Sequence, residues 1–282
     1  MAKGTAPGKV ILAGEHFVLH GAPALAVPIV GRGVQVEVVP GEEAWAVAPS
    51  VLPHLLAMLE RLQVDPETVT IRVESTLPVG AGLGGSAALA VALVRAVRGG
   101  ASSPDAIRAE AHELEKIAHG QPSGIDDAVA AWERPVLLTQ DRDLRVLDLP
   151  VPPGLWIGVT PERTSTLEAV GQVADLAARE PDRVASLARQ AADLCEQCLT
   201  AWRADDWPAL GGQLHRGHGL LQELGVSTPS LDRLVESALS HGAWGAKLTG
   251  GGLGGAVVAL GPPDLDLSDA WRAAGALEVI AS

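Results

Sequence analysis

The most informative stretch of the chain reads, from residue 78 to residue 88, Pro78-Val79-Gly80-Ala81-Gly82-Leu83-Gly84-Gly85-Ser86-Ala87-Ala88. A branched, apolar segment at residues 69–74 precedes it, and an Ala- and Val-rich segment at residues 87–98 follows it. The sequence therefore predicts a strand, a glycine-rich turn and a helix, in this order. Glycines let backbone N–H groups approach an oxyanion, and the amides at a helix N-terminus favour negative charge. The stretch thus predicts an anion cradle, with the Ser86 hydroxyl available to a phosphate or its metal ion.

Two other interpretations of this turn have to be weighed. A plain tight turn needs the same glycines, and residues 80–85 also match the dinucleotide fingerprint G-x-G-x-x-G. Residues 250–255 match that fingerprint too, in a chain with 32 glycines, so the spacing alone indicates little. A dinucleotide site would also require an acidic residue at the end of a second strand, where this chain starts a helix at residues 103–105. The P-loop pattern G-x-x-x-x-G-K-[ST] does not occur in the sequence.

Composition and charge narrow the class of protein. The 282 residues suffice for one large domain or two modest ones, each with its own core. The formal net charge of -13 and the absence of a run of basic residues argue against nucleic acid as a partner. Charged or helix-breaking residues interrupt every apolar run, and the first residues do not resemble a secretory signal. We therefore expect a cytoplasmic protein that uses no membrane.

The hydrophobic pattern predicts a mixed α+β protein, β-rich in its N-terminal half and helix-rich in its C-terminal half, with a C-terminal sheet. Strands are expected at residues 9–13, 24–39, 69–74, 136–139, 144–149, 155–160, 246–248 and 256–260. Helices are expected at residues 87–98 and 104–118, and across residues 165–241 with breaks at Pro181, Pro208 and Pro229. We place the boundary between two domains, 1–155 and 156–282, at the change from strands to helices.

Cys195 and Cys198 are the only cysteines, and their C-x-x-C spacing also occurs in redox pairs and metal sites. They lie in a helical pattern rather than beside a βαβ unit, which favours a structural interpretation. His215 and His218 could supply a second ligand pair, but this combination is a weak signal for a metal.

Three segments resemble the motifs of the GHMP kinases, in the same order along the chain. They are residues 7–16 (PGKVILAGEH), residues 78–88 and residues 247–255 (KLTGGGLGG). Within this superfamily, residues 14–26 and 119–127 resemble the mevalonate kinases. The resemblance extends from residue 7 to residue 260.

The resemblance implies a two-domain GHMP kinase fold, ATP and Mg²⁺ as cofactors, and transfer of the γ-phosphoryl group to the 5-hydroxyl of mevalonate. The expected partners are these small molecules and a second copy in a homodimer. Two alternatives stay open. One is another GHMP small-molecule kinase, acting on phosphomevalonate or a sugar, and the other is a non-catalytic nucleotide-binding regulator on the same fold.

The family's functional residues carry over by motif. Asp126 resembles the catalytic carboxylate and Lys9 the catalytic lysine, while Ser86 and Glu115 resemble the Mg²⁺ ligands. Glu15, His16 and Thr166 resemble substrate-binding residues. The residues expected to bind the ATP phosphates are Pro78, Gly80, Gly82, Leu83, Gly84, Gly85 and Ser86.

Each role has a structural alternative. Asp126 could be an ordinary carboxylate at a helix N-terminus, Glu115 a solvated carboxylate at a helix edge, and His16 a core histidine. Lys9 could be an exposed strand lysine, but the chain has 17 arginines and only four lysines, so a lysine in an apolar strand is conspicuous. Beside Asp126, its ammonium would keep the carboxylate ionised.

Three positions depart from the family pattern. Gly85 stands where a serine is usual, Asp127 where an asparagine is usual, and Leu253 where a glycine is usual. Gly85 lacks one hydroxyl contact, and Leu253 changes how closely the backbone can approach there. None of the three removes a proposed chemical group.

Overall fold

The computed structural model describes residues 2–41, 44–99, 102–120, 122–163 and 166–282. The chain forms two compact units, which interleave in sequence. Unit 1 comprises Met1–Lys9, Pro28–Leu77 and Gly84–Arg134, and unit 2 comprises Val10–Val27, Pro78–Leu83 and Pro135–Ser282. The predicted boundary between family domains at residue 155 stays a prediction.

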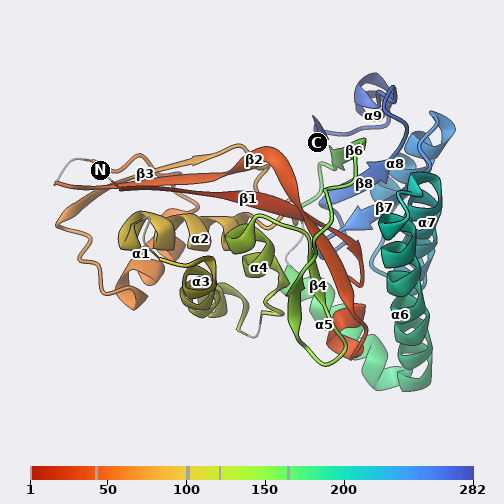
Figure 1. The fold of residues 1–282 in the computed structure, drawn as a ribbon, viewed down its shortest axis with the longest axis horizontal. Coiled ribbons are helices and arrows are strands. Elements are labelled where there is room, and N and C mark those ends of the chain that lie inside the picture. Colours follow the sequence, from red (N-terminus) through yellow and green to blue (C-terminus); the bar gives the residue numbers. More distant parts are fainter. Residues whose placement is uncertain (1, 42–43, 100–101, 121, 164–165) are drawn as a thin grey trace. The chain divides into compact units, whose positions relative to one another are not determined.

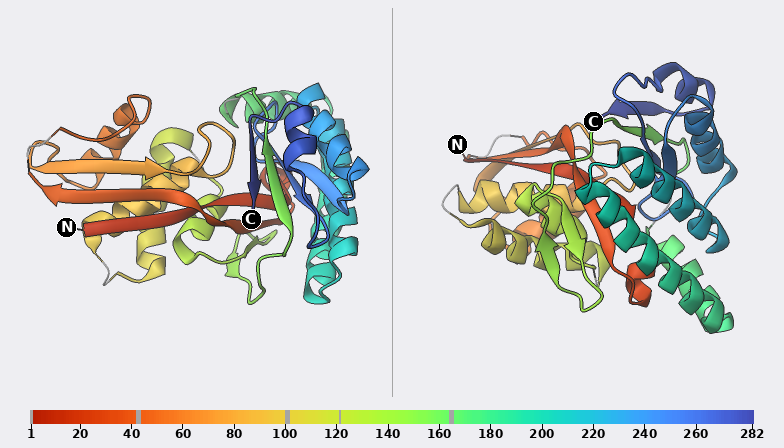
Figure 2. Two further views of the ribbon diagram at one scale, coloured as in Figure 1. Left: turned by 90° about the horizontal axis from the view of Figure 1, so that it is seen from above. Right: turned by 45° about the vertical axis from the view of Figure 1, so that its right-hand side comes forward.

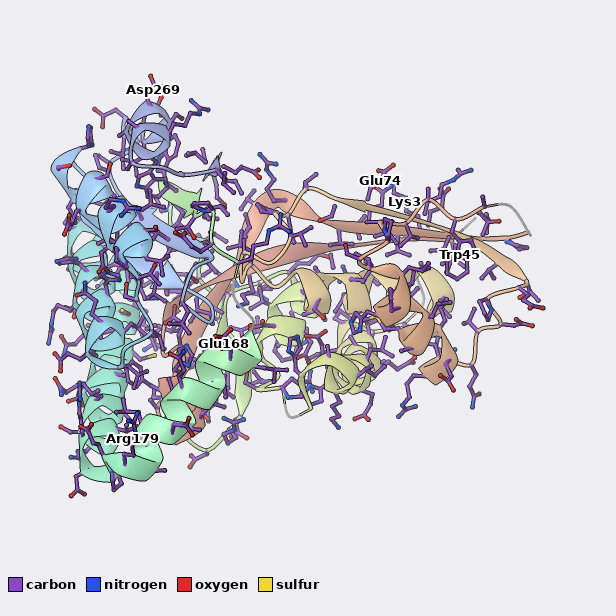
Figure 3. All side chains as sticks on the ribbon, turned by 180° about the vertical axis from the view of Figure 1, so that it is seen from behind. Lys3, Trp45, Glu74, Glu168, Arg179 and Asp269 are labelled. Carbon is purple, nitrogen blue, oxygen red and sulfur yellow. The ribbon has the colours of Figure 1, made fainter. Side chains whose placement is uncertain are left out.

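Unit 1 is a layer of strands covered by helices. Its strands are residues 2–9 of β1 (Ala2–Ala13), residues 28–40 of β2 (Ala24–Pro40), and β3 (Val69–Ser75). β2 and β3 are antiparallel, with Val34 opposite Ser75 and Pro40 opposite Val69. Trp45 donates its indole N–H to Val69 O at 2.8 Å, beside the start of β3 (Figure 3).

The helices described in unit 1 lie on one side of these strands (Figure 1). They are α1 (Leu52–Arg61), α2 (Gly85–Arg98), α3 (Pro104–His119) and α4 (Ile125–Trp132). Most of α2 is small and apolar, so it is buried along nearly its whole length, and α3 and α4 both pack on it. Ser103 accepts a hydrogen bond from Ala106 N and Pro104 follows it, so α3 begins as the sequence predicted.

Unit 2 contains a second sheet with the strand order β7-β8-β6-β9. Its strands are β6 (Leu155–Val159), β7 (Gly245–Thr249), β8 (Ala256–Leu260) and β9 (Glu278–Ala281), all paired antiparallel. The unit also holds the remaining residues of β1 and β2, the 3-10 helix η1 (Phe17–His20), and the hairpin of β4 (Val136–Leu138) and β5 (Leu144–Val146).

The helices described in unit 2 are α5 (Thr166–Arg179), α6 (Pro181–Arg203), α7 (Trp207–Glu223), α8 (Pro229–Ser240) and α9 (Ser268–Ala273). Three of them, α6, α7 and α8, carry a proline in their first turn, whereas α5 and α9 do not. Proline fits the first turn of a helix because the missing N–H would lack an intrahelical partner there. The long helices α6 and α7 lie side by side, and α7 packs on β7 (Figure 2).

The predicted α+β class is confirmed, and the predicted strands and helices are present with shifted ends. β1 begins at Ala2 rather than residue 9, and the prediction missed α1, η1, α9 and β9. In the described part of the chain, no helix combines the length and apolar character needed to cross a membrane.

Candidate active site

In unit 1, Lys9 and Asp126 form an ion pair. Lys9 lies in β1 and is 4% exposed, whereas Asp126 stands in the first turn of α4. Lys9 Nζ is 3.2 Å from Asp126 Oδ2, and the carboxylate side chain keeps 37% of its surface exposed. The pair thus joins a buried ammonium to a carboxylate that stays accessible to a ligand.

Gly84 is required where the glycine-rich turn passes Lys9. Its φ is +76°, and a Cβ on Gly84 would lie 2.9 Å from Lys9 Cγ. A side chain here would therefore strain the backbone and displace the lysine. The glycine fixes the lysine beside the N-terminus of α2.

The turn itself has the conformation of an anion site. Gly80, Gly82 and Gly84 have positive φ of 73°, 74° and 76°, whereas Ala81 and Leu83 between them do not. Alternation of this kind turns successive N–H groups toward one side and forms a concavity for anions. α2 follows with Gly84 as its N-cap, without a side-chain cap among the described residues, so its first amides are available to an anion.

Ser86 and Glu115 meet at this helix end. The Ser86 hydroxyl donates to Glu115 Oε1 at 2.6 Å, from the first turn of α2 to the last turns of α3. Glu115 is only 3% exposed, so it is not a solvated carboxylate at a helix edge. Burial raises the pKa of Glu115 to about 7, although the Ser86 hydrogen bond opposes the shift.

Two histidines flank this pair. His54 Nε2 of α1 is 3.4 Å from Ser86 Oγ, and His119 Nε2 is 3.7 Å from Glu115 Oε2. Burial lowers the pKa of His54, and the nearby His119 lowers it further. No role was predicted for either histidine: His54 lies outside the family motifs, and the resemblance of residues 119–127 assigns no function to His119.

A hydroxyl and a carboxylate form a suitable partial ligand set for Mg²⁺. This ion prefers oxygen ligands and keeps waters and phosphate oxygens in its shell, so two protein ligands suffice. Across the described residues, no group of three or more His, Cys, Asp or Glu side chains is arranged to hold a metal alone. Ser86 and Glu115 therefore suit a metal ion that takes its remaining ligands from water and from a bound phosphate group.

In unit 2, the first part of the glycine-rich turn packs against the turn between β7 and β8. A Cβ on Gly250 would lie 2.8 Å from Gly82 O, and one on Gly255 would lie 3.0 Å from Ala81 O. The two turns thus contact each other through backbone, which only glycine allows. They line a small cavity together with Thr166, the first residue of α5. Thr164 and Ser165, the two residues before Thr166, lie outside the described residues.

Glu15 is buried in an ion pair with Lys247 of β7. The two side chains are 2% and 1% exposed. Lys247 Nζ also donates to Ile11 O at 3.2 Å and to Leu248 O at 2.6 Å. Lys247 belongs to the family-like segment 247–255, for which no ion pair was predicted. The scarcity of lysine that made Lys9 conspicuous applies equally to Lys247 and could have pointed to it.

His16 follows in a strained conformation with φ +58°. Its Nε2 lies 2.7 Å from Gly251 O, while its Nδ1 is buried without a hydrogen-bond partner in the described part of the chain. Burial lowers the pKa of His16, although the bond to Gly251 opposes this. An unpaired buried nitrogen on a strained residue is typical of a ligand-binding position.

Cys195 and Cys198 are free and buried in α6. Burial raises the pKa of both thiols, that of Cys198 to about 12, so both remain protonated at neutral pH. Buried thiols of this kind are chemically inert. The structure therefore supports a structural role for the pair.

The structure brings together Lys9 with Asp126, and Ser86 with Glu115, both within unit 1. Gly84 and Gly85 of the turn belong to the same unit. The other predicted residues belong to unit 2: Glu15, His16, Pro78, Gly80, Gly82, Leu83 and Thr166.

Comparison with known proteins finds matches over nearly the whole chain. The N-terminal domain of the GHMP kinases matches residues 51–133, and their C-terminal domain matches residues 191–277. The mevalonate kinase of Aeropyrum pernix is 35% identical, covering 92% of this chain and 88% of the relative. That of Methanothermobacter thermautotrophicus is 31% identical, covering 95% of each chain.

The fold agrees with a solved structure. The crystal structure of L. major mevalonate kinase in complex with R-mevalonate matches with a TM-score of 0.82 and 26% identity. The match covers 99% of this chain and 94% of that one.

Proposed function

Because the chain belongs to the GHMP kinases, and within them to the mevalonate kinases, we propose that it transfers the γ-phosphoryl group of ATP to the 5-hydroxyl of mevalonate. The product is 5-phosphomevalonate. The observation that carries the proposal is the Lys9–Asp126 pair, a buried ammonium 3.2 Å from an accessible carboxylate. Phosphoryl transfer depends on positioning and charge stabilisation rather than covalent help, and this pair supplies both.

Asp126 receives or orients the hydroxyl proton of the acceptor. The Asp126 side chain is accessible to the acceptor, because it keeps 37% of its surface exposed. Lys9 stabilises the negative charge that develops on the attacking oxygen. The compact ammonium of lysine serves both partners better than a planar guanidinium would.

The ATP phosphates bind to the glycine-rich turn. We assign this role to Pro78, Gly80, Gly82, Leu83, Gly84, Gly85 and Ser86. The alternating positive φ values of this turn and the uncapped α2 N-terminus support the assignment.

Ser86 and Glu115 would hold Mg²⁺ together with phosphate oxygens of the nucleotide. Bound there, the ion would neutralise charge on the phosphates. Glu115 has to lose its proton to bind the ion, and its raised pKa of about 7 makes this exchange accessible near neutral pH.

On the acceptor side we propose His16, Glu15 and Thr166. The unpaired Nδ1 of His16 supports a direct contact with the acceptor. Glu15 forms its buried ion pair with Lys247, and this pair would hold in place the backbone that carries the neighbouring His16. The cytoplasm as compartment and a homodimer as assembly remain predictions from the sequence.

An ADP-release assay with a panel of acceptors tests the proposal. Mevalonate should support turnover, while phosphomevalonate, diphosphomevalonate, galactose and homoserine should give at least about 100-fold lower kcat/KM. Turnover with another acceptor but not with mevalonate would move the chain to a different branch of the superfamily. ATP binding without turnover on any acceptor would favour the non-catalytic regulator.

A further inference from the structure

The short helix α4 carries Asp126 and is fastened to α3 by side chains that the proposed reaction does not use. Arg108 Nη1 of α3 lies 3.6 Å from Asp127 Oδ2 of α4. The same guanidinium lies over the Trp132 ring, 5.5 Å from its centroid. Arg108 therefore contacts both the first and the last turn of α4.

Neighbouring contacts strengthen this attachment. His112 Nδ1 lies 3.4 Å from Asp127 Oδ1. The Trp132 indole donates to Asp105 Oδ1 at 2.7 Å. Three residues on successive turns of α3 thus hold an eight-residue helix that could not stay folded by itself.

Asp127 differs from its neighbour Asp126 in being 1% exposed. Burying a carboxylate is costly unless a cation or hydrogen bond compensates for it. Burial raises the pKa of Asp127 to about 6, while His112 lowers it and the charge of Asp126 raises it again. Glu115 also interacts with Asp127 by charge, and α2 directs Arg95 to Ala131 O, at the other end of α4.

Asp127 Oδ2 and Arg108 Nε are both buried without a hydrogen-bond partner in the described part of the chain. The attraction between the two side chains is therefore chiefly one of charge. Removing only the cation would leave a buried carboxylate with too little compensation, whereas neutralising both partners would not.

We propose that Arg108 and Asp127 are positioning residues, which fix the first turn of α4 so that Asp126 stays within reach of Lys9 and the acceptor hydroxyl. This inference rests on the proposed role of Asp126 in phosphoryl transfer. Asp127 is the next residue after Asp126 in the first turn of α4, so a displacement of the backbone at Asp127 would move the Asp126 carboxylate as well. A displacement of about 1 Å at a reacting group can cost about 100-fold in rate.

The test compares Arg108→Met with the double variant Arg108→Met/Asp127→Asn. For each variant, kcat and KM for ATP are measured, and calorimetric titration gives the number of ATP molecules bound per protein chain. Arg98→Met is the matched control, because Arg98 forms an exposed ion pair with Glu110 between α2 and the same helix α3. Arg108→Met should lower kcat about 10- to 100-fold while KM for ATP stays within about 2-fold. The double variant should recover kcat to within about 5-fold of the wild type.

Wild-type kcat in Arg108→Met, or a double variant no faster than Arg108→Met, would overturn the proposal. So would equal losses in Arg108→Met and Arg98→Met. If kcat and the number of ATP molecules bound per chain fell by the same factor in Arg108→Met, part of the protein would be unfolded. That result would likewise contradict a positioning role.

If Arg108→Met does not fold, Arg108→Lys decides the question, since lysine keeps the charge but cannot stack as a planar group on Trp132. We expect its kcat to be about 3- to 10-fold lower with an unchanged KM for ATP. Wild-type kcat in Arg108→Lys would overturn the inference. Failure of the wild-type enzyme to phosphorylate mevalonate would instead contradict the proposed function, so the two failures are distinguishable.

Discussion

Glu115 is a buried carboxylate whose ionised form needs a cation. It is 3% exposed, and burial raises its pKa to about 7. Glu113 lies two residues earlier on α3, is half-buried, and pairs with Lys116 and Arg61. The same helix therefore offers a proposed metal ligand and a matched control.

Glu115→Gln and Ser86→Ala should each weaken binding of Mn²⁺, used as a spectroscopic substitute for Mg²⁺, to the ATP complex. Loss of the carboxylate charge at residue 115, or of the hydroxyl ligand at residue 86, should reduce affinity about 10- to 100-fold, measured by electron paramagnetic resonance. Glu113→Gln should bind Mn²⁺ as the wild type does. Unchanged affinity in Glu115→Gln would exclude this carboxylate as a ligand.

His218 provides a pH-dependent contribution to the stability of unit 2. Its Nε2 donates to Asp232 Oδ1 at 3.0 Å, and its Nδ1 accepts from Leu248 N at 3.4 Å, which requires the neutral ring. Burial lowers the pKa of His218, and the bond to Asp232 opposes this. A lowered pKa in the folded state means that the stabilisation is complete above about pH 6.5 and is lost as the pH falls through the folded pKa.

His218→Gln should therefore cost about 1–2 kcal/mol of unfolding free energy at pH 8. The gap between variant and wild type should narrow at pH 5, because only the wild type loses stabilisation by protonation of His218. Urea denaturation at both pH values measures it. A gap that widens toward pH 5 would contradict the assigned neutral state.

At the scale of residues, the sequence could predict chemistry that is tied to motifs, and little else. The resemblance named Lys9, Asp126, Ser86 and Glu115, and the structure brings them together in pairs, although their roles stay predictions. It could not predict partners such as Lys247 for Glu15, because that pair joins residues 232 positions apart. No local pattern encodes such a distance.

At the scale of elements, close backbone contacts explain several glycines. Gly211 in α7 faces β7: a Cβ there would lie 2.5 Å from Trp244 Cβ and 3.0 Å from Gly245 N. Gly212 is the next residue of the same helix, and a Cβ there would meet nothing within 4 Å. The helix therefore contains one glycine required by packing and one that packing does not require.

Gly211→Ala should lower the free energy of unfolding by about 1–3 kcal/mol, because the added methyl group forces α7 away from β7. Gly212→Ala should be neutral or stabilise the protein by up to about 1 kcal/mol, since alanine favours a helix. Chemical denaturation of both variants measures the difference. Equal effects of the two substitutions would contradict the described packing.

Elements with a regular pattern or clear punctuation could be predicted from the sequence. Pro181, Pro208 and Pro229 predicted breaks, and each stands in the first turn of a helix. The missed helix α1 has no side-chain cap at its start, and β9 has only four residues. Such elements depend on tertiary packing more than on local preference.

At the scale of the whole molecule, the three motifs predicted the family, and the comparisons confirm it. The division of the chain into two compact units could not be predicted from these motifs, because each unit is formed by three separate segments of the chain. Hydrophobic periodicity reports on neighbours along the chain, whereas this interleaving depends on contacts between distant segments.

The central claim is that the enzyme phosphorylates mevalonate with ATP and that Asp126, paired with Lys9, is its catalytic carboxylate. Rapid-quench measurement of a single turnover from labelled ATP to mevalonate, in the wild type and in Asp126→Asn, tests it most directly. The account predicts a transfer rate lowered by about 100- to 10,000-fold in Asp126→Asn, with the ATP dissociation constant within about 3-fold of the wild type. A transfer rate near that of the wild type in Asp126→Asn would contradict it.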